Sequence, residues 1–322
     1  MCTIMKRVLL LCAVAVAIAL AALPLIIGGR KAPVGVSFPE SPIELTANED
    51  FGMQLINMFN IIQIPDGTYR MYFIANPQDG IAENEKLQNL YYAESRDGFH
   101  YEFKGKLMDE LIEQTIFMVK DKDYPYRMVG CQWIGEKSWE RGLFLWKSKD
   151  GLEFTDRKMI YDKIHDTQNV MIPRGKRLRL YSRITQENYM NRRGTVAEFN
   201  SQGDQISDTK ILAGDFLYNS AACKVDRHYD LLFPTYYNTH GKTTDTCFFR
   251  CYVTDGSFVR ELPCELNRWV EPDEHWVLAA PGFVFIDGER YLAYNTRTRS
   301  HETSETGMVS KYKLIKTVLE YD

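Results

Sequence analysis

Apolar and aromatic runs of strand length alternate with short polar turns along the chain from about residue 45 onwards. Two of these turns are close copies: "SRDGFHYEF" begins at Ser95 and "SKDGLEFTD" begins at Ser148, a step of 53 residues. The same step reaches "FNSQGDQIS" at Ser201 and "YVTDGSFVR" at Thr254, and then Gly307, where a strand-like run remains without the turn. A fixed period of this length predicts an array or a propeller.

A second repeated element lies between these turns. It consists of a polar turn followed by a strand-like run, as in "DGTYRMYFI", "DYPYRMVGC", "GKRLRLYSR", "DRHYDLLFP" and "DGERYLAYN". One unit therefore comprises strand, tight turn, strand, loop, strand, Asp-Gly turn and strand. Four strands per unit, repeated five times, predict an all-β, five-bladed β-propeller with four antiparallel strands per blade. The Asp-Gly turn is expected to close the outer hairpin of each blade.

Two other folds explain the pattern less well. Regularly spaced turns are also typical of a β-sandwich, but a sandwich gives no reason for a constant period. Long helical periodicity is absent after the N-terminal segment, and only Lys106 to Gln114, which is short, has a helix-like pattern.

The N-terminal segment differs from the rest of the chain. Lys6 and Arg7 precede twenty uncharged residues, from Val8 to Ile27, which predicts an export signal or an uncleaved membrane anchor. A lipoprotein signal at Cys12 is the third alternative, although the small residue expected before such a cysteine is missing. We therefore expect residues 1–30 to be a leader and 31–322 to be an exported propeller, periplasmic, extracellular or membrane-anchored. Contact with a membrane is expected only through this segment.

Charge and cysteine content exclude several classes of function. The net charge of −4 leaves no basic surface for nucleic acid. Five cysteines follow the leader, and neither their odd number nor their spacing indicates a disulfide framework or a zinc site. Buried or free thiols are the simpler expectation.

In a propeller the innermost strands line a central channel, and a ligand site is expected at its mouth. The repeat places amides and carboxylates where these strands begin, and amides suit a ligand rich in hydroxyl groups because they both donate and accept hydrogen bonds. The candidates are Asn57 and Asn60 in blade 1, Glu113 and Gln114 in blade 2, Asp166, Gln168 and Asn169 in blade 3, and Asn219 in blade 4. Solvated strand ends are the alternative interpretation.

Residues 45 to 315 resemble the five-bladed propeller superfamily of carbohydrate-active enzymes, which includes glycoside hydrolase families 32, 43, 62, 68, 117 and 130. The resemblance lies in "YRMYF", "YYAESRDGFHYE", "LFLWKSKDGLEF" and "HDTQNVMI" followed by "LRLYSR". It implies acidic residues at the inner ends of blades 1, 2 and 3, because glycoside hydrolysis needs two carboxylates across the scissile bond. This chain departs from that pattern at Asn57, where fructan-cleaving members carry Asp.

The resemblance implies a glycoside hydrolase-like enzyme that acts on an oligo- or polysaccharide. Asp166 would be one catalytic carboxylate, with Glu113 or Asp50 as its partner; Asp215 and Glu274 are weaker candidates. A phosphorylase would instead use cationic side chains for phosphate, and Arg297, Arg299 and His301 are the candidates for that role, with a solvated loop as the alternative interpretation. Arg297 and His301 are also candidates for substrate binding. The alternatives are a non-catalytic carbohydrate-binding propeller and a scaffold for protein partners. No cofactor is expected, although some members of the superfamily hold a divalent ion in the channel.

Overall fold

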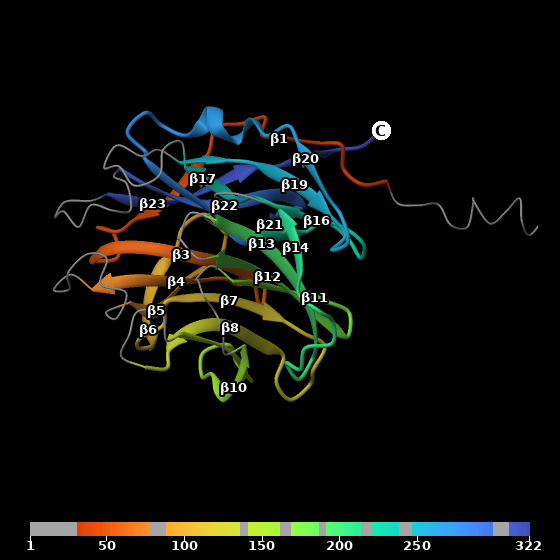
Figure 1. The fold of residues 1–322 in the computed structure, drawn as a ribbon. Helices are drawn as coiled ribbons and strands as arrows, with labels where there is room; N and C mark the ends of the chain where they lie inside the picture. The colour runs from red at the N-terminus through yellow and green to blue at the C-terminus, as the bar shows by residue number, and fades with distance from the viewer. Residues whose placement is uncertain are drawn as a thin grey trace, which may run out of the picture.

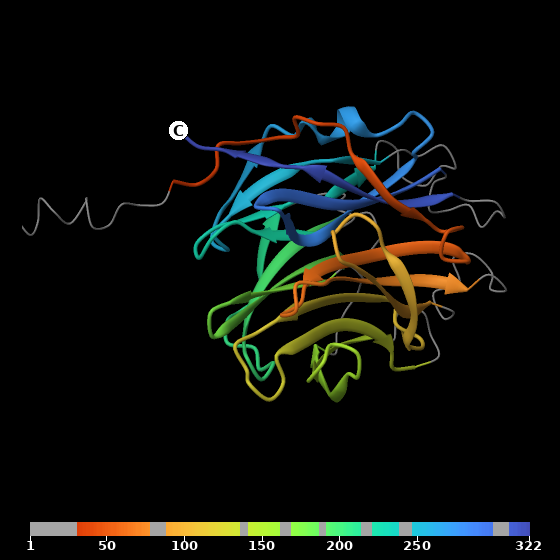
Figure 2. The same cartoon turned by 180° about the vertical axis from the view of Figure 1, so that it is seen from behind.

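A computed structural model describes residues 31–77, 88–135, 141–161, 169–186, 191–213, 221–237, 247–298 and 309–322. These residues form five antiparallel four-stranded sheets arranged as the blades of a propeller, as predicted. The colour gradient passes from blade to blade around the ring and returns to its start, where the red N-terminal segment runs beside the blue C-terminal strands (Figure 1, Figure 2). No helix in the described part of the chain is long and apolar enough to cross a membrane.

The first three blades each use four consecutive strands, the first of which is innermost. Blade 1 consists of β3 (Met53–Gln63), β4 (Tyr69–Pro77), β5 (Asn89–Ser95) and β6 (Glu102–Met108). Blade 2 consists of β7 (Glu113–Met118), β8 (Tyr126–Trp133), β9 (Arg141–Ser148) and β10 (Thr155–Tyr161). Blade 3 consists of β11 (Val170–Arg174), β12 (Arg177–Gln186), β13 (Asn191–Asn200) and β14 (Lys210–Ala213). The helix-like stretch Lys106 to Gln114 is thus the end of one strand and the start of the next.

Blades 4 and 5 depart from this simple order. Blade 4 comprises β15 (Ala222–Lys224), β16 (Asp230–Leu232), β19 (Cys251–Thr254) and β20 (Val259–Leu262), with β17 (Thr235–Tyr237) and β18 (Cys247–Phe249) as a separate pair and a 3₁₀ turn, η2 (Glu265–Trp269), after β20. Blade 5 comprises β21 (Trp276–Ile286), β22 (Glu289–Arg297), β23 (Ser310–Lys316) and, as its outermost strand, β2 (Ile43–Ala47) from the N-terminal part of the chain. The pairing of β2 with β23 closes the ring of blades. Next to it, β1 (Gly35–Ser37) pairs with β24 (Val318–Glu320).

The apolar core is divided among the interfaces between blades. The described residues form five apolar clusters, and each contains side chains from two adjacent blades. In β4, for example, Met71 and Phe73 face blade 5, whereas Tyr72 and Ile74 face blade 2. Successive residues of a strand point to opposite faces, so a strand covered on both faces reads as a continuous apolar run. This accounts for runs such as "YRMYFIA".

The Asp-Gly turns close the outer hairpins, as predicted. In blade 1 the Ser95 hydroxyl accepts a hydrogen bond from the Gly98 N–H at 2.9 Å, and Asp97 Oδ1 accepts from the Phe99 and His100 N–H groups at 2.8 and 2.9 Å. The turn at Asp150 of blade 2 repeats this arrangement. These side chains replace hydrogen bonds that the sharp turn denies to the backbone.

Candidate functional site

The innermost strands lie around the propeller axis, and three of the predicted site residues lie where these strands begin. Glu113 and Gln114 open β7, Asn169 directly precedes β11, and Asn57 and Asn60 lie within β3. Arg297 is the last residue of β22. The other predicted residues, Asp166, Gln168, Asn219 and His301, together with Asp215 and Arg299, lie outside the described residues.

Glu113 and Asn169 meet between blades 2 and 3. The backbone N–H of Asn169 donates to Glu113 Oε1 at 3.2 Å, and the side-chain amide of Asn169 donates to the same oxygen. Glu113 is 1% exposed and Asn169 is 4% exposed. Two residues predicted separately, a carboxylate of blade 2 and an amide of blade 3, are therefore joined in one buried pair.

Three amide side chains, those of Gln114, Asn169 and Asn295, form a small polar layer next to this pair. Gln114 donates to the Tyr72 carbonyl at 3.0 Å, but its buried Oε1 has no hydrogen-bond partner among the described residues. The side-chain oxygen and nitrogen of Asn295 also have no hydrogen-bond partner among the described residues. Asn295 is a buried residue of β22 that is not among the residues predicted from the sequence. Gln114, Asn169 and Asn295 border a cavity of about 10 Å³, the size of one water molecule. The signal for Asn295 was an amide at the end of the apolar run "YLAYN".

Asn57 and Arg297 form a second contact between predicted residues, across the interface of blades 1 and 5. Arg297 donates to Asn57 Oδ1 at 2.6 Å, although the two residues are 240 positions apart. Asn57 lies in a bulge of β3, between the paired positions Ile56 and Phe59. The guanidinium of Arg297 also lies over the ring of Trp276, 5.4 Å from its centre. At the position where the resemblance to fructan-cleaving members implies an Asp, this chain has an amide bound by a buried cation.

The Asn60 side chain connects two inner strands. Its amide donates to the Ile116 carbonyl at 2.8 Å, and its oxygen accepts from the Ile116 N–H at 3.2 Å. Asn60 thus ties β3 to β7 through the backbone, and it is 2% exposed.

Two further predicted carboxylates lie on blade 5 or in its connection to blade 1. Asp50 is exposed in the turn from β2 to β3, where its Oδ2 accepts from the Ala47 N–H at 2.7 Å. Glu274, by contrast, is buried, pairs with the ammonium of Lys313 and accepts from the Thr296 hydroxyl at 2.7 Å. No hydrogen bond among the described residues joins Asp50 to Glu113.

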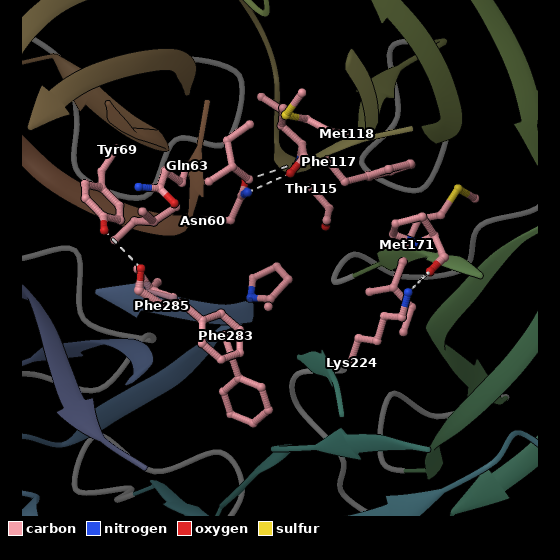
Figure 3. A pocket seen from close by; sticks show the side chains of 18 residues that line it. Asn60, Gln63, Tyr69, Thr115, Phe117, Met118, Met171, Lys224, Phe283 and Phe285 are labelled. Atoms are coloured by element: carbon pink, nitrogen blue, oxygen red, sulfur yellow. Dashed lines mark hydrogen bonds between the residues drawn. The ribbon is translucent and has the colours of Figure 1, made fainter. Parts of the chain in front are cut away.

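The channel widens on the other side of the polar layer, towards the C-terminal ends of the inner strands. A cavity of about 380 Å³ lies there, lined by residues of all five blades (Figure 3). Its wall is mostly apolar: Phe283 and Phe285 lie on one side of the cavity, and Met171 and Lys224 lie opposite. This cavity could not be predicted from the sequence, because its apolar lining residues follow the same strand pattern as residues of the core.

Four of the five cysteines after the leader are buried, and Cys264 is half-buried. Burial raises the pKa of the Cys251 and Cys223 thiols. Protonated thiols are poor nucleophiles and metal ligands. Within the described ranges no group of three or more His, Cys, Asp or Glu side chains gathers as a metal site.

Comparison with known proteins supports the fold at the level of structure. A glycosyl hydrolase from Bacteroides ovatus matches with a TM-score of 0.58 and 14% identity, over 88% of this chain and 94% of that one. A solved structure from glycoside hydrolase family 130 also matches with a TM-score of 0.58 and 14% identity, over 88% of this chain and 92% of that one. That family is described as mannoside phosphorylases that include hydrolases of β-1,2-mannosidic linkages in Candida mannan. β-1,2-Mannobiose phosphorylase from Listeria innocua matches with a TM-score of 0.55 and 10% identity, over 81% and 90%. Neither a family model nor a curated protein matches the sequence.

Proposed function

We propose that this chain is an exported glycoside hydrolase-like protein that acts on an oligo- or polysaccharide where its inner strands begin. The observation that carries the proposal is the buried Glu113–Asn169 pair, which sets a carboxylate and an amide side by side on adjacent inner strands. The structural neighbours, which are glycoside hydrolases and phosphorylases, support a carbohydrate as the ligand. Export would use the segment 1–30.

Hydrolysis requires a second carboxylate in addition to Glu113. In our proposal Asp166 is that group, because the sequence places it three residues before Asn169, which binds Glu113. One carboxylate would protonate the leaving oxygen and the other would act as nucleophile or as base towards water, at separations of about 5–5.5 Å or about 6.5–9.5 Å respectively. Amides such as Gln168 and Asn219 would bind sugar hydroxyls, because they can both donate and accept.

The test is a hydrolysis screen of the full chain against plant and host oligosaccharides, with and without phosphate. Three variants are compared: Asp166→Asn, Glu113→Gln and Asp50→Asn, with Asp208→Asn as an exposed control remote from the inner strands. We expect turnover to be lost in the first two variants and kept in the last two. Loss in Asp50→Asn with retention in Glu113→Gln would exchange the roles of these two carboxylates. Full turnover in both Asp166→Asn and Glu113→Gln would refute the proposed site.

A non-catalytic carbohydrate-binding propeller is the second candidate, and the Asn57–Arg297 contact favours it. That contact places an amide where the resembling enzymes have a carboxylate, so one of the usual acids is replaced. Glycan-array binding by the wild-type chain without turnover of any bound glycan would select this candidate. Phosphate-dependent cleavage that is lost in Arg297→Gln would instead indicate a phosphorylase.

A further inference from the structure

The cavity at the C-terminal ends of the inner strands differs chemically from the predicted glycan site at the other end. Its volume of about 380 Å³ falls within the range of small-molecule pockets, roughly 300–1,000 Å³. The wall contains aliphatic side chains from blades 1, 2 and 3 and aromatic side chains from blade 5. The free energy of binding to such a surface is most favourable for a ligand that buries apolar area against it.

The neutral polar groups of the wall are already bonded to the protein backbone. Asn60 is bonded to Ile116, Gln63 donates to the Gly67 carbonyl at 3.2 Å, and the Tyr69 hydroxyl donates to the Phe285 carbonyl at 3.0 Å. A sugar in this cavity would bury hydroxyl groups without partners, which is costly. This wall therefore suits an apolar ligand better than a glycan.

One cation lines the cavity, a second lies beside two of its lining rings, and neither forms a salt bridge with a described carboxylate. The ammonium of Lys224 has three N–H donors, and its one hydrogen bond with a described residue goes to the Pro173 carbonyl at 3.2 Å. Arg290 is paired across the sheet with Phe285, and its guanidinium lies 5.2 and 5.4 Å from the ring centres of Phe283 and Phe285. Its buried Nε has no hydrogen-bond partner among the described residues.

The two carboxylates whose charges act on Lys224 are Asp226 and Asp230, and neither lines the cavity. Asp230 is fully buried, pairs with Arg174 and Arg179, and accepts from the Tyr181 hydroxyl at 2.6 Å. None of the eighteen residues that line the cavity, all of them described, carries a carboxylate. The wall of the cavity thus carries one ammonium group and no carboxylate.

We propose that this cavity is a second binding site, which takes a small molecule with an apolar, aromatic body and a single carboxylate. The carboxylate pairs with Lys224, and the body lies between Phe283 and the aliphatic side chains of the opposite blades. Lys224 is the exposed last residue of β15, so the pair forms at the open edge of the cavity, where a charge-assisted hydrogen bond is stronger than a neutral one.

The electrostatics of Lys224 agree with this geometry. Burial, followed by the charge of Arg174, lowers the pKa of the Lys224 ammonium. A carboxylate bound beside it would oppose both effects, because an opposite charge favours the protonated amine.

The experiment is calorimetric titration of the full chain with 4-phenylbutyrate and with its neutral analogue 4-phenylbutan-1-ol. We expect the carboxylate to bind at least about tenfold more tightly than the alcohol, since a hydrogen bond to a charged group is worth that factor or more. Lys224→Gln should weaken 4-phenylbutyrate about tenfold and leave the alcohol unchanged. Lys176→Gln, an exposed lysine in the neighbouring turn of blade 3, is the matched control and should change neither affinity.

A second variant tests the cavity itself. Met118→Trp, at the half-buried end of β7, should narrow the space and weaken binding of both compounds, with thermal unfolding used to verify that the variant is folded. No binding of 4-phenylbutyrate to the wild-type chain at millimolar concentration would overturn the proposal. Equal affinity in wild type and Lys224→Gln, or equal weakening in Lys176→Gln, would overturn it as well.

Discussion

Gly151, in the outer turn of blade 2, is where that turn packs against blade 1. Its φ is +77°, a conformation that costs an L-residue about 1–2 kcal/mol. A Cβ atom there would lie 2.6 Å from the Tyr72 hydroxyl oxygen, 3.0 Å from Cδ1 of Tyr126 and 3.1 Å from Nη1 of Arg70. Tyr72 and Tyr126 are both buried, so neither ring has space into which it could move.

The expected loss for Gly151→Ala therefore has two parts. Backbone strain contributes about 1–2 kcal/mol, and overpacking against buried rings contributes about 1–3 kcal/mol. Gly175 separates the two parts, because its φ is +66° and a Cβ there would meet nothing within 4 Å. We expect Gly175→Ala to lower the free energy of unfolding by about 1.5 kcal/mol and Gly151→Ala by about 3.5 kcal/mol.

The assay is urea unfolding of the full chain, followed by tryptophan fluorescence, with the m-value compared between variants. Tyr72→Phe provides a further check, because it removes the atom closest to the new methyl group, at the cost of the hydrogen bond from Tyr72 to the Gly151 carbonyl (3.0 Å). In that background Gly151→Ala should cost less than it does in the wild type. Equal losses at Gly151 and Gly175 would refute the inference that the turn is tightly packed between blades.

Three other perturbations test the interfaces between blades. Asn60→Leu removes both hydrogen bonds to the buried backbone of Ile116 and should cost about 3 kcal/mol in urea unfolding. Asp230→Asn removes the buried partner of two arginines and should cost about 3–5 kcal/mol in the same assay; a loss below about 1 kcal/mol would contradict the role of this network. The pKa of Asp97 is lowered by the His100 side chain and by backbone N–H groups. Burial raises the pKa of Asp150, but backbone N–H groups outweigh it, so this pKa is lowered as well. The contribution of both carboxylates to the free energy of unfolding should therefore be complete above about pH 4 and be lost as the pH falls through the lowered pKa. Thermal unfolding between pH 2 and 7 should show this decline, and Asp150→Asn should reduce its slope.

Most of the fold could be predicted because its signals are local and repeated. The spacing from Ser95 to Ser148 identified the outer hairpins, and the runs covered on both faces identified strands enclosed between blades. The closure of blade 5 could not be predicted, because β2 pairs with β23 nearly the whole chain away and the fifth copy lacks the turn that marks the others. A period describes neighbouring units and gives no information about how the two ends of a ring meet.

The candidate site was predictable one strand at a time. Counting back from the repeated turns placed Glu113 and Asn169 at the starts of adjacent inner strands, where the structure joins them. The Asn57–Arg297 contact required knowledge of which blades are neighbours around the ring, and Arg297 was considered only for its charge. The cavity at Lys224 was missed because its wall is apolar.

The closure of the ring by β2 also sets an order of events during synthesis. Residues 43–47 are made early, but their partner strand, Ser310–Lys316, is made nearly last. At about 5–20 residues per second, β2 waits roughly 15 to 50 s for that partner. During this interval it is an unpaired strand edge, the kind of segment that associates with other chains. A chaperone or membrane that holds the N-terminal part of the nascent chain would protect this edge until the last blade arrives.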